Sequence, residues 1–364
     1  MKSKFTIISG FMMIFLLLGT IVMAQDTENE EIKGPKLRII SGFEGGSNYQ
    51  MAMDIQRMTR KSLGEAIYDV NTEYVPKTGP NGDTLREENL DGEMEIVTEE
   101  KITKTPTGDT IDFIKVLESE GSYYNFLKIN KSGADIAFLQ YDVLLYESMQ
   151  DLKRRFKKAE TIRVLLPMGT EQIHIVVLKS NDKKSIKKFS DLKKKRVAIG
   201  SSLMGTNITA KYIKEVTGSK WEDVEIPFDK SFKALFNGSI DAFFYVGAKP
   251  VKDLANLSVA MRDKITLISI PQNEKLDKAY EKATITPEDY KWLDGNIDTY
   301  AVRSLLVTSI AGQTPEKEAH IKQVLEIIKA NKDNPSNHSN WKLVKFAKDD
   351  KIDWEYYPAA LQLY

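Results

Sequence analysis

The feature that most constrains the fold is a strand–loop–helix module that occurs twice in the sequence. In the first copy, residues 37–40 form an apolar run that leads into a Gly/Ser loop, after which hydrophobic residues recur at helical spacing up to Leu63. In the second copy, residues 196–199 lead through a Ser/Gly loop into a helical pattern over residues 206–216. Because strand and helix patterns alternate throughout, the sequence predicts an α/β fold with parallel strands, arranged as two lobes that face one another.

The composition is that of an ordinary globular protein without a charge excess. The 364 residues provide room for two domains, and the 52 basic residues equal the 52 acidic residues in number. This balance gives no indication of nucleic-acid binding. The chain contains no cysteine, which excludes disulfides, thiol nucleophiles, thiolate metal ligands and the acylated cysteine of a lipoprotein.

The N-terminal 24 residues have the pattern of a secretory signal. Lys2 and Lys4 precede a nearly continuous apolar run over residues 5–23, and a polar, acidic stretch begins after Ala24. We expect a cleaved signal peptide over residues 1–24 and a flexible leader over residues 25–35. The alternative is an uncleaved membrane anchor, because the apolar run approaches the length that spans a bilayer. With cleavage, the protein is periplasmic and is not a lipoprotein.

Three loops that precede helical patterns contain the residue types of an anion site. Gly46 and Ser47 stand at the start of the first helix, Gly121 and Ser122 precede a second, and Ser-Ser-Leu-Met-Gly-Thr at residues 201–206 precedes a third. Backbone N–H groups at helix N-termini, together with hydroxyl groups, bind carboxylates or phosphates. Loops at the carboxyl ends of neighbouring strands can meet at one ligand. Ordinary helix capping by Ser and Thr is the alternative explanation.

The histidines and serines give no support to an enzyme. His174 lies in an apolar run, His320 lies on a helix near lysines, and His338 lies in a polar segment. No metal-ligand spacing and no Gly-x-Ser-x-Gly elbow is present, and residues 42–47 match neither a dinucleotide fingerprint nor a P-loop. We therefore expect no catalytic residue, no cofactor and no metal site. The basic run over residues 183–196 has apolar residues at helical spacing, which indicates a solvated surface turn.

An acidic segment interrupts the α/β pattern over residues 76–104. Turn dipeptides and Gly/Pro-rich stretches surround a strand-like run at residues 94–97, and residues 76–109 contain nine acidic against four basic residues. We predict an inserted β-hairpin that decorates the surface. Disorder of its first half is the alternative.

Four segments, in order along the chain, match the pattern of one known family. They are SGFEGGSNYQ, EGSYYNFLKINKSGADIAFLQYDV, FSDLKKKRVAIGSSLMGT and NGSIDAFFYVGAKPVKDLANL. In these segments the chain resembles the TAXI family, the solute-binding subunits of tripartite ATP-independent periplasmic (TRAP) transporters, from about residue 37 to the C-terminus. The family positions that it keeps include Asn125, Asp135, Gln140 and Asp142. It departs from the family pattern at Lys194, Met204, Tyr357 and Ala359, and in the insertion.

The resemblance implies a two-lobed fold like that of type II periplasmic binding proteins, with a central cleft and a hinge of crossover strands. We expect the crossover strands near residues 173–178 and 265–270. Lobe I then comprises residues 36–177 and 267–364, and lobe II comprises residues 178–266. The resemblance also implies transfer of the solute to a separate TRAP membrane permease.

These observations predict a monomeric solute-binding protein that captures a small organic anion, a carboxylate or an amino acid, between its lobes. The alternative function is a sensor that presents its ligand to a membrane signalling receptor. The predicted ligand-binding residues are Gly46, Ser47, Tyr49, Ser122, Asn125, Ser202, Gly205, Thr206, Tyr245 and Gly247.

Overall fold

The computed structural model describes residues 34–89, 91–180 and 185–364. The predicted signal peptide, and the predicted leader up to residue 33, lie outside the described residues. Within the described ranges, no helix is both long enough and apolar enough to cross a membrane.

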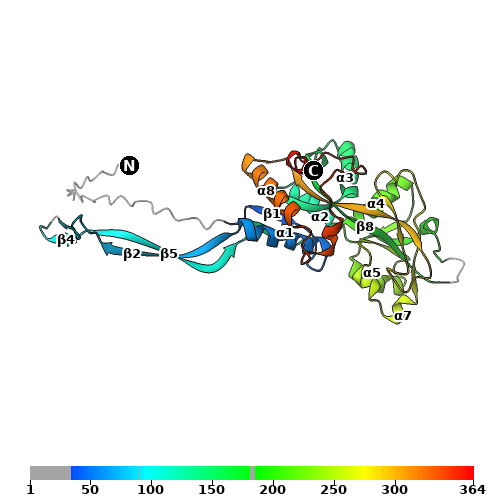
Figure 1. Ribbon diagram of the computed structural model, residues 1–364. Coiled ribbons are helices and arrows are strands. Elements are labelled where there is room, and N and C mark those ends of the chain that lie inside the picture. The colour runs from blue at the N-terminus through cyan, green and yellow to red at the C-terminus, as the bar shows by residue number, and fades with distance from the viewer. Residues whose placement is uncertain (1–33, 90, 181–184) are drawn as a thin grey trace, which may run out of the picture. The chain divides into compact units, whose positions relative to one another are not determined.

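Ten strands of the described chain form one mixed sheet (Figure 1). Their order is β10-β9-β11-β8-β14-β7-β1-β6, with β12 paired to β8 and β13 paired to β14. The strands are β1 (Leu37–Ile40), β6 (Ile114–Leu117), β7 (Ile136–Gln140), β8 (Ile162–Leu178), β9 (Arg196–Ala198), β10 (Glu222–Val224), β11 (Ala242–Gly247), β12 (Ile265–Leu267), β13 (Glu281–Ile285) and β14 (Ile297–Ser309). The predicted parallel pairing is found between β1 and its neighbours β6 and β7, and between β9 and its neighbours β10 and β11. The strands β8, β12, β13 and β14 pair in antiparallel fashion.

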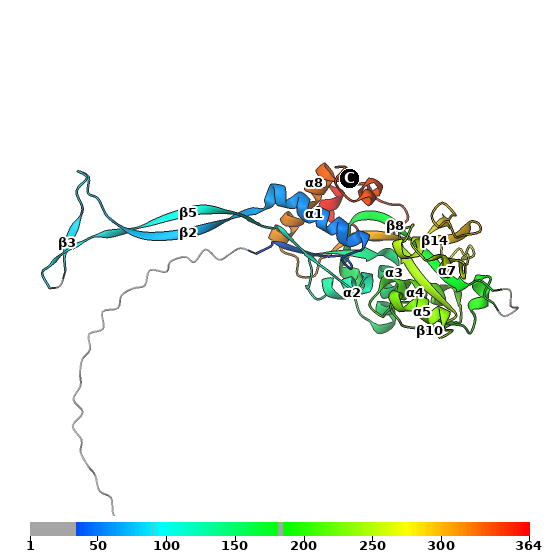
Figure 2. The same cartoon turned by 90° about the horizontal axis from the view of Figure 1, so that it is seen from below.

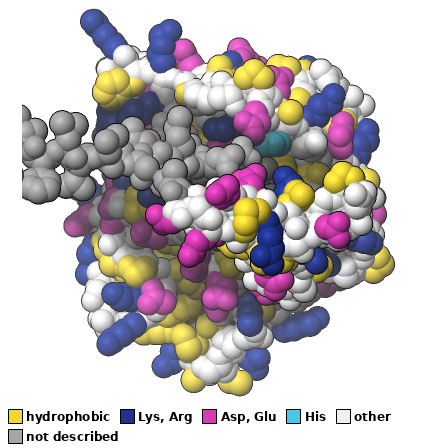
Figure 3. All heavy atoms as spheres, turned by 90° about the vertical axis from the view of Figure 1, so that its left-hand side faces the viewer, with side chains coloured by type: hydrophobic (Ala, Val, Ile, Leu, Met, Phe, Trp, Pro, Cys, Tyr) yellow, Lys and Arg dark blue, Asp and Glu magenta, His cyan; other side chains and the backbone are white. Residues whose placement is uncertain are grey.

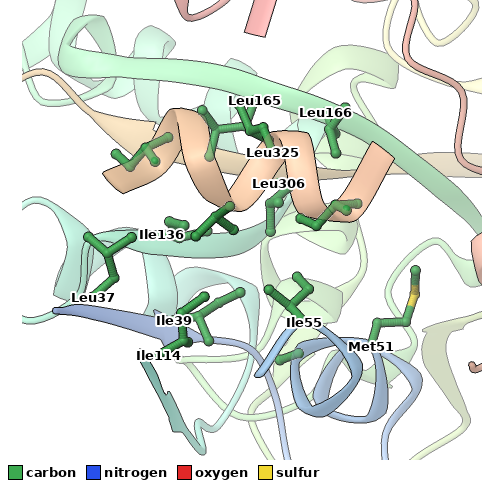
Figure 4. Packing of buried hydrophobic residues seen from close by; sticks show 14 of the residues in the cluster. Leu37, Ile39, Met51, Ile55, Ile114, Ile136, Leu165, Leu166, Leu306 and Leu325 are labelled. Atoms are coloured by element: carbon green, nitrogen blue, oxygen red, sulfur yellow. The ribbon is translucent and has the colours of Figure 1, made fainter. Parts of the chain in front are cut away.

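Helices cover both faces of the first half of the sheet. They are α1 (Ser47–Leu63), α2 (Ser122–Ile129), α3 (Tyr141–Arg154), α8 (Pro315–Asn331) and α9 (Pro358–Leu361), with the 3-10 turns η1 (Ala159–Thr161) and η3 (Ser339–Leu343). Side chains alternate between two cores along each strand: Ile39 packs with α1 and α8 (Figure 4), whereas the adjacent Ile40 packs with α2 and α3. This alternation is required of a strand that is buried on both faces. As the sequence predicts, Thr314 caps α8, with its hydroxyl oxygen accepting the Lys317 N–H at 3.2 Å.

Two further hydrophobic cores pack against the two faces of the other half of the sheet. Its helices are α4 (Gly205–Thr217), α5 (Phe228–Phe236), α6 (Lys252–Ala255) and α7 (Val259–Arg262), with the 3-10 turn η2 (Phe189–Leu192). On β11, Phe244 packs with α4, and the adjacent Phe243 packs with Leu235 of α5. The α/β fold with two lobes is therefore confirmed. The first lobe contains β1, β6 and β7, and the second lobe contains β9, β10 and β11.

Two long strands belong to both lobes. The first part of β8 pairs with β14 over residues 162–172, and its second part pairs with β11 over residues 172–177. Likewise β14 pairs with β13 over residues 297–301 and with β7 over residues 304–307. The prediction that residues 265–270 cross between the lobes is wrong, because β12 is a short strand that pairs with the second part of β8, on the edge opposite to β11, in the second lobe. An apolar run alone cannot distinguish these two positions.

The inserted segment forms a long two-stranded ribbon (Figures 1 and 2). Strand β2 (Glu65–Pro76) pairs with β5 (Thr98–Ile111), and a short hairpin of β3 (Arg86–Glu88) and β4 (Met94–Ile96) lies between them in the chain. The predicted hairpin is present, but it begins directly after α1 and is longer than residues 76–104. The sequence conceals its true ends because polar residues dominate β5 and are interspersed among the apolar residues of β2.

Candidate functional site

A cavity of about 470 Å³ lies between the two lobes. Its walls are the loops after β1, β6 and β11, the end of β7, the middle of β8, and the start of α4. The ends of β1, β6 and β7 are carboxyl ends of parallel strands, where α/β folds place their ligands. Its size is that of a site for a small metabolite.

Seven of the ten predicted ligand-binding residues line this cavity: Gly46, Ser47, Ser122, Gly205, Thr206, Tyr245 and Gly247. They come from four segments that are far apart in the sequence. The other three lie elsewhere. Tyr49 is half-buried on α1, and Ser202 is exposed in the loop before α4. Asn125 is fully buried, and its side-chain amide donates to the carbonyl oxygens of Ser41 at 2.6 Å and Phe138 at 2.8 Å.

Three helices begin at the cavity wall. Helix α1 starts at Ser47, α2 starts at Ser122, and α4 starts at Gly205. Their first N–H groups have no partner within their own helices, and the helix dipoles make this side of the cavity electropositive. The arrangement is one that binds an anion.

Two hydroxyl groups on this wall accept a hydrogen bond from the protein and do not use their own O–H as a donor to any described residue. The Ser122 hydroxyl oxygen accepts the backbone N–H of Gln140 at 2.7 Å, and the Thr206 hydroxyl oxygen accepts the N–H of Val246 at 3.3 Å. Each hydroxyl is therefore oriented by the protein and keeps its own O–H as a donor. The hydroxyl of Ser47 makes no hydrogen bond to any described residue, so the alternative that Ser47 acts only as a helix cap does not apply.

Two glycines on the wall are required by close packing. A Cβ atom at Gly205 would lie 1.8 Å from Oε1 of Gln140 and 3.0 Å from Cβ of Ser122, so α4 can approach the first lobe only with glycine there. A Cβ atom at Gly247 would lie 2.8 Å from the ring of Tyr245. Tyr245 is held against Phe228, with ring centroids 4.2 Å apart, and burial raises its pKa to about 12. Its ring forms a fixed apolar part of the wall.

The predicted set does not contain Glu171, which lines the cavity from the middle of β8. Its carboxylate accepts the side-chain N–H of Gln140 at 2.6 Å and of Asn48 at 3.3 Å. Burial raises the pKa of Glu171, and no described residue forms a salt bridge with it. In the sequence, Glu171 is indicated by its place as an acidic residue between two apolar runs. This signal is weak in the sequence because residues 161–166 and 173–178 have the pattern of two separate strands.

Two further acceptors face the same side as Glu171. Oε1 of Gln140 and the hydroxyl of Ser304 are buried without a hydrogen-bond partner in the described structure, and both residues line the cavity. Buried polar groups normally have partners, so each of these two atoms lacks the hydrogen bond that would offset its burial. The cavity thus combines a donor-rich wall at the helix starts with an acceptor-rich wall along β7, β8 and β14.

Asp142 joins the lobes behind the cavity. It lies in the first turn of α3, is fully buried, and accepts the hydroxyl groups of Thr209 at 2.6 Å and Tyr280 at 2.8 Å. Burial raises its pKa to about 6. A third contact between the lobes is the hydrogen bond from the Tyr124 N–H to the carbonyl oxygen of Leu203, at 3.0 Å. These contacts hold the starts of α2, α3 and α4 together.

His174 supports the cavity wall without facing the cavity. It is fully buried, which confirms its interpretation as a core residue. Its Nδ1 lies 2.9 Å from the carbonyl oxygen of Gln172, and its Nε2 lies 2.9 Å from the hydroxyl of Tyr290. That hydroxyl accepts the N–H of Val251, a cavity residue, at 2.8 Å. Burial lowers the pKa of His174 to about 4, so the ring is neutral at pH 7.

Arg163 on β8 and Arg303 on β14 pair within the protein. Arg163 pairs with Glu355 at 2.5 Å, and Arg303 pairs with Asp349 at 3.0 Å and also with Glu281. Among the residues that the structure describes, no group of three or more His, Asp or Glu side chains is placed to hold a metal ion.

The fold and the cleft define a two-lobed α/β protein with a small-molecule cavity between its lobes. The family model of the NMT1-like family matches residues 100–346, and the chain belongs to this family.

Solved structures of similar fold have low sequence identity. PhnD1 from Prochlorococcus marinus (MIT 9301), in complex with methylphosphonate, is 11% identical, with 81% of this chain and 84% of that chain covered and a TM-score of 0.43. XAC2383 from Xanthomonas citri, bound to ATP, is 8% identical, with 82% and 85% covered and a TM-score of 0.45. A putative L-cystine ABC transporter from Listeria monocytogenes is 13% identical, with 82% and 91% covered and a TM-score of 0.40.

Proposed function

We propose that the protein is an extracytoplasmic solute-binding protein that holds a small carboxylate-bearing metabolite between its lobes and delivers it to a TRAP-type membrane permease. The observation that carries the proposal is the convergence of three helix starts on one cavity. The ligand carboxylate would accept hydrogen bonds from their N–H groups and from the hydroxyls of Ser122 and Thr206. Delivery to a permease rests on the resemblance to the TAXI family. Export rests on the signal-like N-terminus, which we propose is cleaved after residue 24.

The acceptor-rich wall supports a ligand that also has hydrogen-bond donors. Glu171, Gln140 and Ser304 offer acceptors without any described basic side chain among them. An ammonium or hydroxyl group of the ligand would satisfy Oε1 of Gln140 and the hydroxyl of Ser304, which otherwise remain unpaired at a cost of about 1–3 kcal/mol each. Amino acids and hydroxy acids are therefore favoured over simple fatty acids.

The hinge that we propose lies in β8 and β14, which are the strands shared by both lobes. Residues 268–302 contribute Ile270, Tyr280 and Tyr300 to the second core. We therefore propose that the second lobe extends to about residue 302, beyond the expected boundary at residue 266. Opening would separate the starts of α2 and α4 and admit the ligand.

A melting-temperature screen tests the proposal. Dicarboxylates, amino acids, hydroxy acids, aromatic acids and phosphorylated metabolites are added separately to the purified protein. A ligand at about 100 times its dissociation constant should stabilise the folded state by about 2.7 kcal/mol, which raises the melting temperature by at least about 2 °C. A hit among the carboxylates, weakened at least tenfold by Thr206→Val, is expected. Hits confined to uncharged compounds would contradict the proposal.

A further inference from the structure

The ribbon formed by β2–β5 has hydrophobic side chains that nothing in the described chain covers. Tyr68 is 48% exposed, Tyr74 is 67% exposed, and Ile102 is 57% exposed. Of the sixteen large hydrophobic residues that are exposed in the described structure, seven lie within residues 65–111, four of them on β2 and β5 and three in or beside the β3–β4 hairpin. The density of these residues exceeds the scatter that is usual on a monomer surface.

Four of these side chains, those of Tyr68, Val70, Tyr74 and Ile102, lie on one face of β2 and β5. In the register of the two strands, Tyr68 is opposite Pro106, Thr72 is opposite Ile102, and residues 70 and 74 continue the same alternation. The other face is polar, with Asp69, Asn71 and Glu73 opposite Thr105, Thr103 and Lys101. An isolated two-stranded ribbon is marginally stable in water, and its outer edges are open to further contacts. An apolar face on such a ribbon indicates a partner.

The net charge of the ribbon indicates the charge that a partner surface should have. Residues 65–111 contain twelve acidic and four basic residues, whereas residues 34–64 and 112–364 contain 36 acidic and 45 basic residues. The ribbon is therefore strongly acidic, and the remainder of the described chain is basic. A second copy of the same chain offers the surface that is complementary in charge.

One surface segment of the body matches both properties of the ribbon. Residues 152–158, at the end of α3, have the sequence Leu-Lys-Arg-Arg-Phe-Lys-Lys, and every one of them is exposed. Leu152 is 79% exposed and Phe156 is 51% exposed. We call this segment the basic patch. Its two hydrophobic side chains suit the apolar face of the ribbon, and its five cations suit the acidic residues around that face. Figure 3 views the molecule from the end at which the ribbon projects, and acidic and hydrophobic side chains lie close together in this view.

We propose that the ribbon of one copy binds the basic patch of a second copy, and that the exchange is reciprocal in a two-fold dimer. A reciprocal contact uses both ribbons and both patches, so it closes without forming filaments. This proposal replaces the expectation of a monomer. It does not rest on the proposed ligand or permease.

Sedimentation velocity tests the proposal on the protein purified in the form that the cell accumulates. A dimer is expected in about 0.1 M salt, with a dissociation constant at least tenfold larger in about 1 M salt, where the Debye length falls from about 10 Å to about 3 Å. A monomer at every concentration up to about 1 mM would overturn the proposal and assign the ribbon to a different protein.

A charge-exchange experiment tests which surfaces meet. The ribbon variant Glu99→Lys/Glu100→Lys and the patch variant Lys157→Glu/Lys158→Glu should each be monomeric, because like charges then face one another. An equimolar mixture should form a heterodimer, since each altered surface meets its complement and the two unaltered surfaces also meet. A mixture that stays monomeric, while both variants give the circular dichroism of the native protein, would overturn the proposal.

Two further variants separate local contact from net charge. Lys230→Glu/Lys233→Glu places the same charge change on exposed positions of α5 and should leave the dimer intact. Leu152→Ser/Phe156→Ser should weaken the dimer at least tenfold without lowering the melting temperature, because both side chains are exposed. A dimer that is indifferent to this pair would exclude the basic patch as the docking site.

Discussion

The cleft and the ribbon differ in the side chains that they bury and expose. The cleft removes polar groups from solvent, whereas the ribbon exposes hydrophobic ones. In the cleft the half-buried Glu171, and behind the cleft the fully buried Asp142, are held by hydrogen bonds. On the ribbon, hydrophobic side chains such as Tyr74 and Ile102 are exposed. Both arrangements cost stability in an isolated monomer, and both are explained if a binding partner occupies the surface. The cleft is coupled to the folded core, whereas the ribbon is joined to it only at its root.

The largest effect that would distinguish the two regions is expected at Gly205. A valine there collides with Gln140 and displaces the start of α4 from the first lobe. Gly205→Val should lower the free energy of unfolding by about 1–3 kcal/mol and weaken ligand binding by at least about a hundredfold. Urea unfolding and calorimetric titration measure the two quantities. Gly295→Ala, where a Cβ atom meets nothing within 4 Å, is the control. Native affinity in Gly205→Val would show that the helix start does not form the site.

The next effect concerns pH and Asp142. Burial raises the pKa of this carboxyl from 3.8 to about 6, so the folded protein retains a proton that the unfolded chain has lost between these values. The Asp142 contribution to stability is therefore complete below about pH 4 and is lost as the pH rises to about 6. Relative to Asp142→Asn, the wild type should lose up to about 3 kcal/mol of unfolding free energy between pH 4 and pH 7.

Urea unfolding at both pH values checks this expectation. The exposed Asp350→Asn controls for the loss of a surface carboxylate. A wild type and an Asp142→Asn variant with parallel pH profiles would contradict the assignment of the buried charge to the joint between the lobes.

A smaller effect is expected from the hydroxyl of Ser122. Removing its O–H deletes one hydrogen bond to a charged ligand group and leaves the Gln140 N–H without an acceptor. Ser122→Ala should weaken binding by more than about tenfold, which corresponds to about 1.4 kcal/mol. Calorimetric titration with the best ligand of the melting screen measures the change. Ser202→Ala, at the exposed serine outside the cavity, should leave the affinity unchanged. Equal affinities of Ser122→Ala and wild type would remove Ser122 from the site.

The smallest effect is expected from the ribbon itself. Val70→Thr/Ile102→Thr keeps the strand propensity and removes apolar area from exposed positions. The ligand affinity and the melting temperature of the monomer should both stay within experimental error, because surface substitutions usually change stability by less than about 0.5 kcal/mol. A clear loss of ligand affinity would contradict the independence of the two regions, since it would show that the ribbon affects binding in the cleft.

The regions also differ in how well the sequence predicts them. The helix starts at Ser47, Ser122 and Gly205 are recognisable because a strand pattern, a Gly/Ser loop and a helical pattern succeed one another in a fixed order. The convergence of these three helix starts at one cavity, together with Tyr245 and Gly247 of β11, results from the topology of the α/β fold. By contrast, Asn125 matches the family pattern but uses its amide donors within the core. A pattern of residue types does not reveal which polar atoms are already paired.

Other features depend on pairing between distant segments. The sequence does not reveal Glu171 as a cavity residue because β8 is a single strand that passes through both lobes, which local periodicity cannot show. The second crossover strand is β14 rather than residues 265–270, because strand order is decided by tertiary contacts and both segments are apolar. The ribbon is longer than its sequence pattern predicts. One of its faces has few hydrophobic side chains, so the hydrophobic pattern that would reveal the strand ends is weak.

The most direct test of the central claim compares a carboxylate with its uncharged counterpart. The best ligand from the melting screen and its primary carboxamide would be titrated into the protein by calorimetry. If three helix starts and two hydroxyl groups hold a carboxylate, the acid should bind at least about a hundredfold more tightly than the amide, a difference of about 2.7 kcal/mol. Equal affinities for the two compounds would contradict an anion site at the starts of α1, α2 and α4.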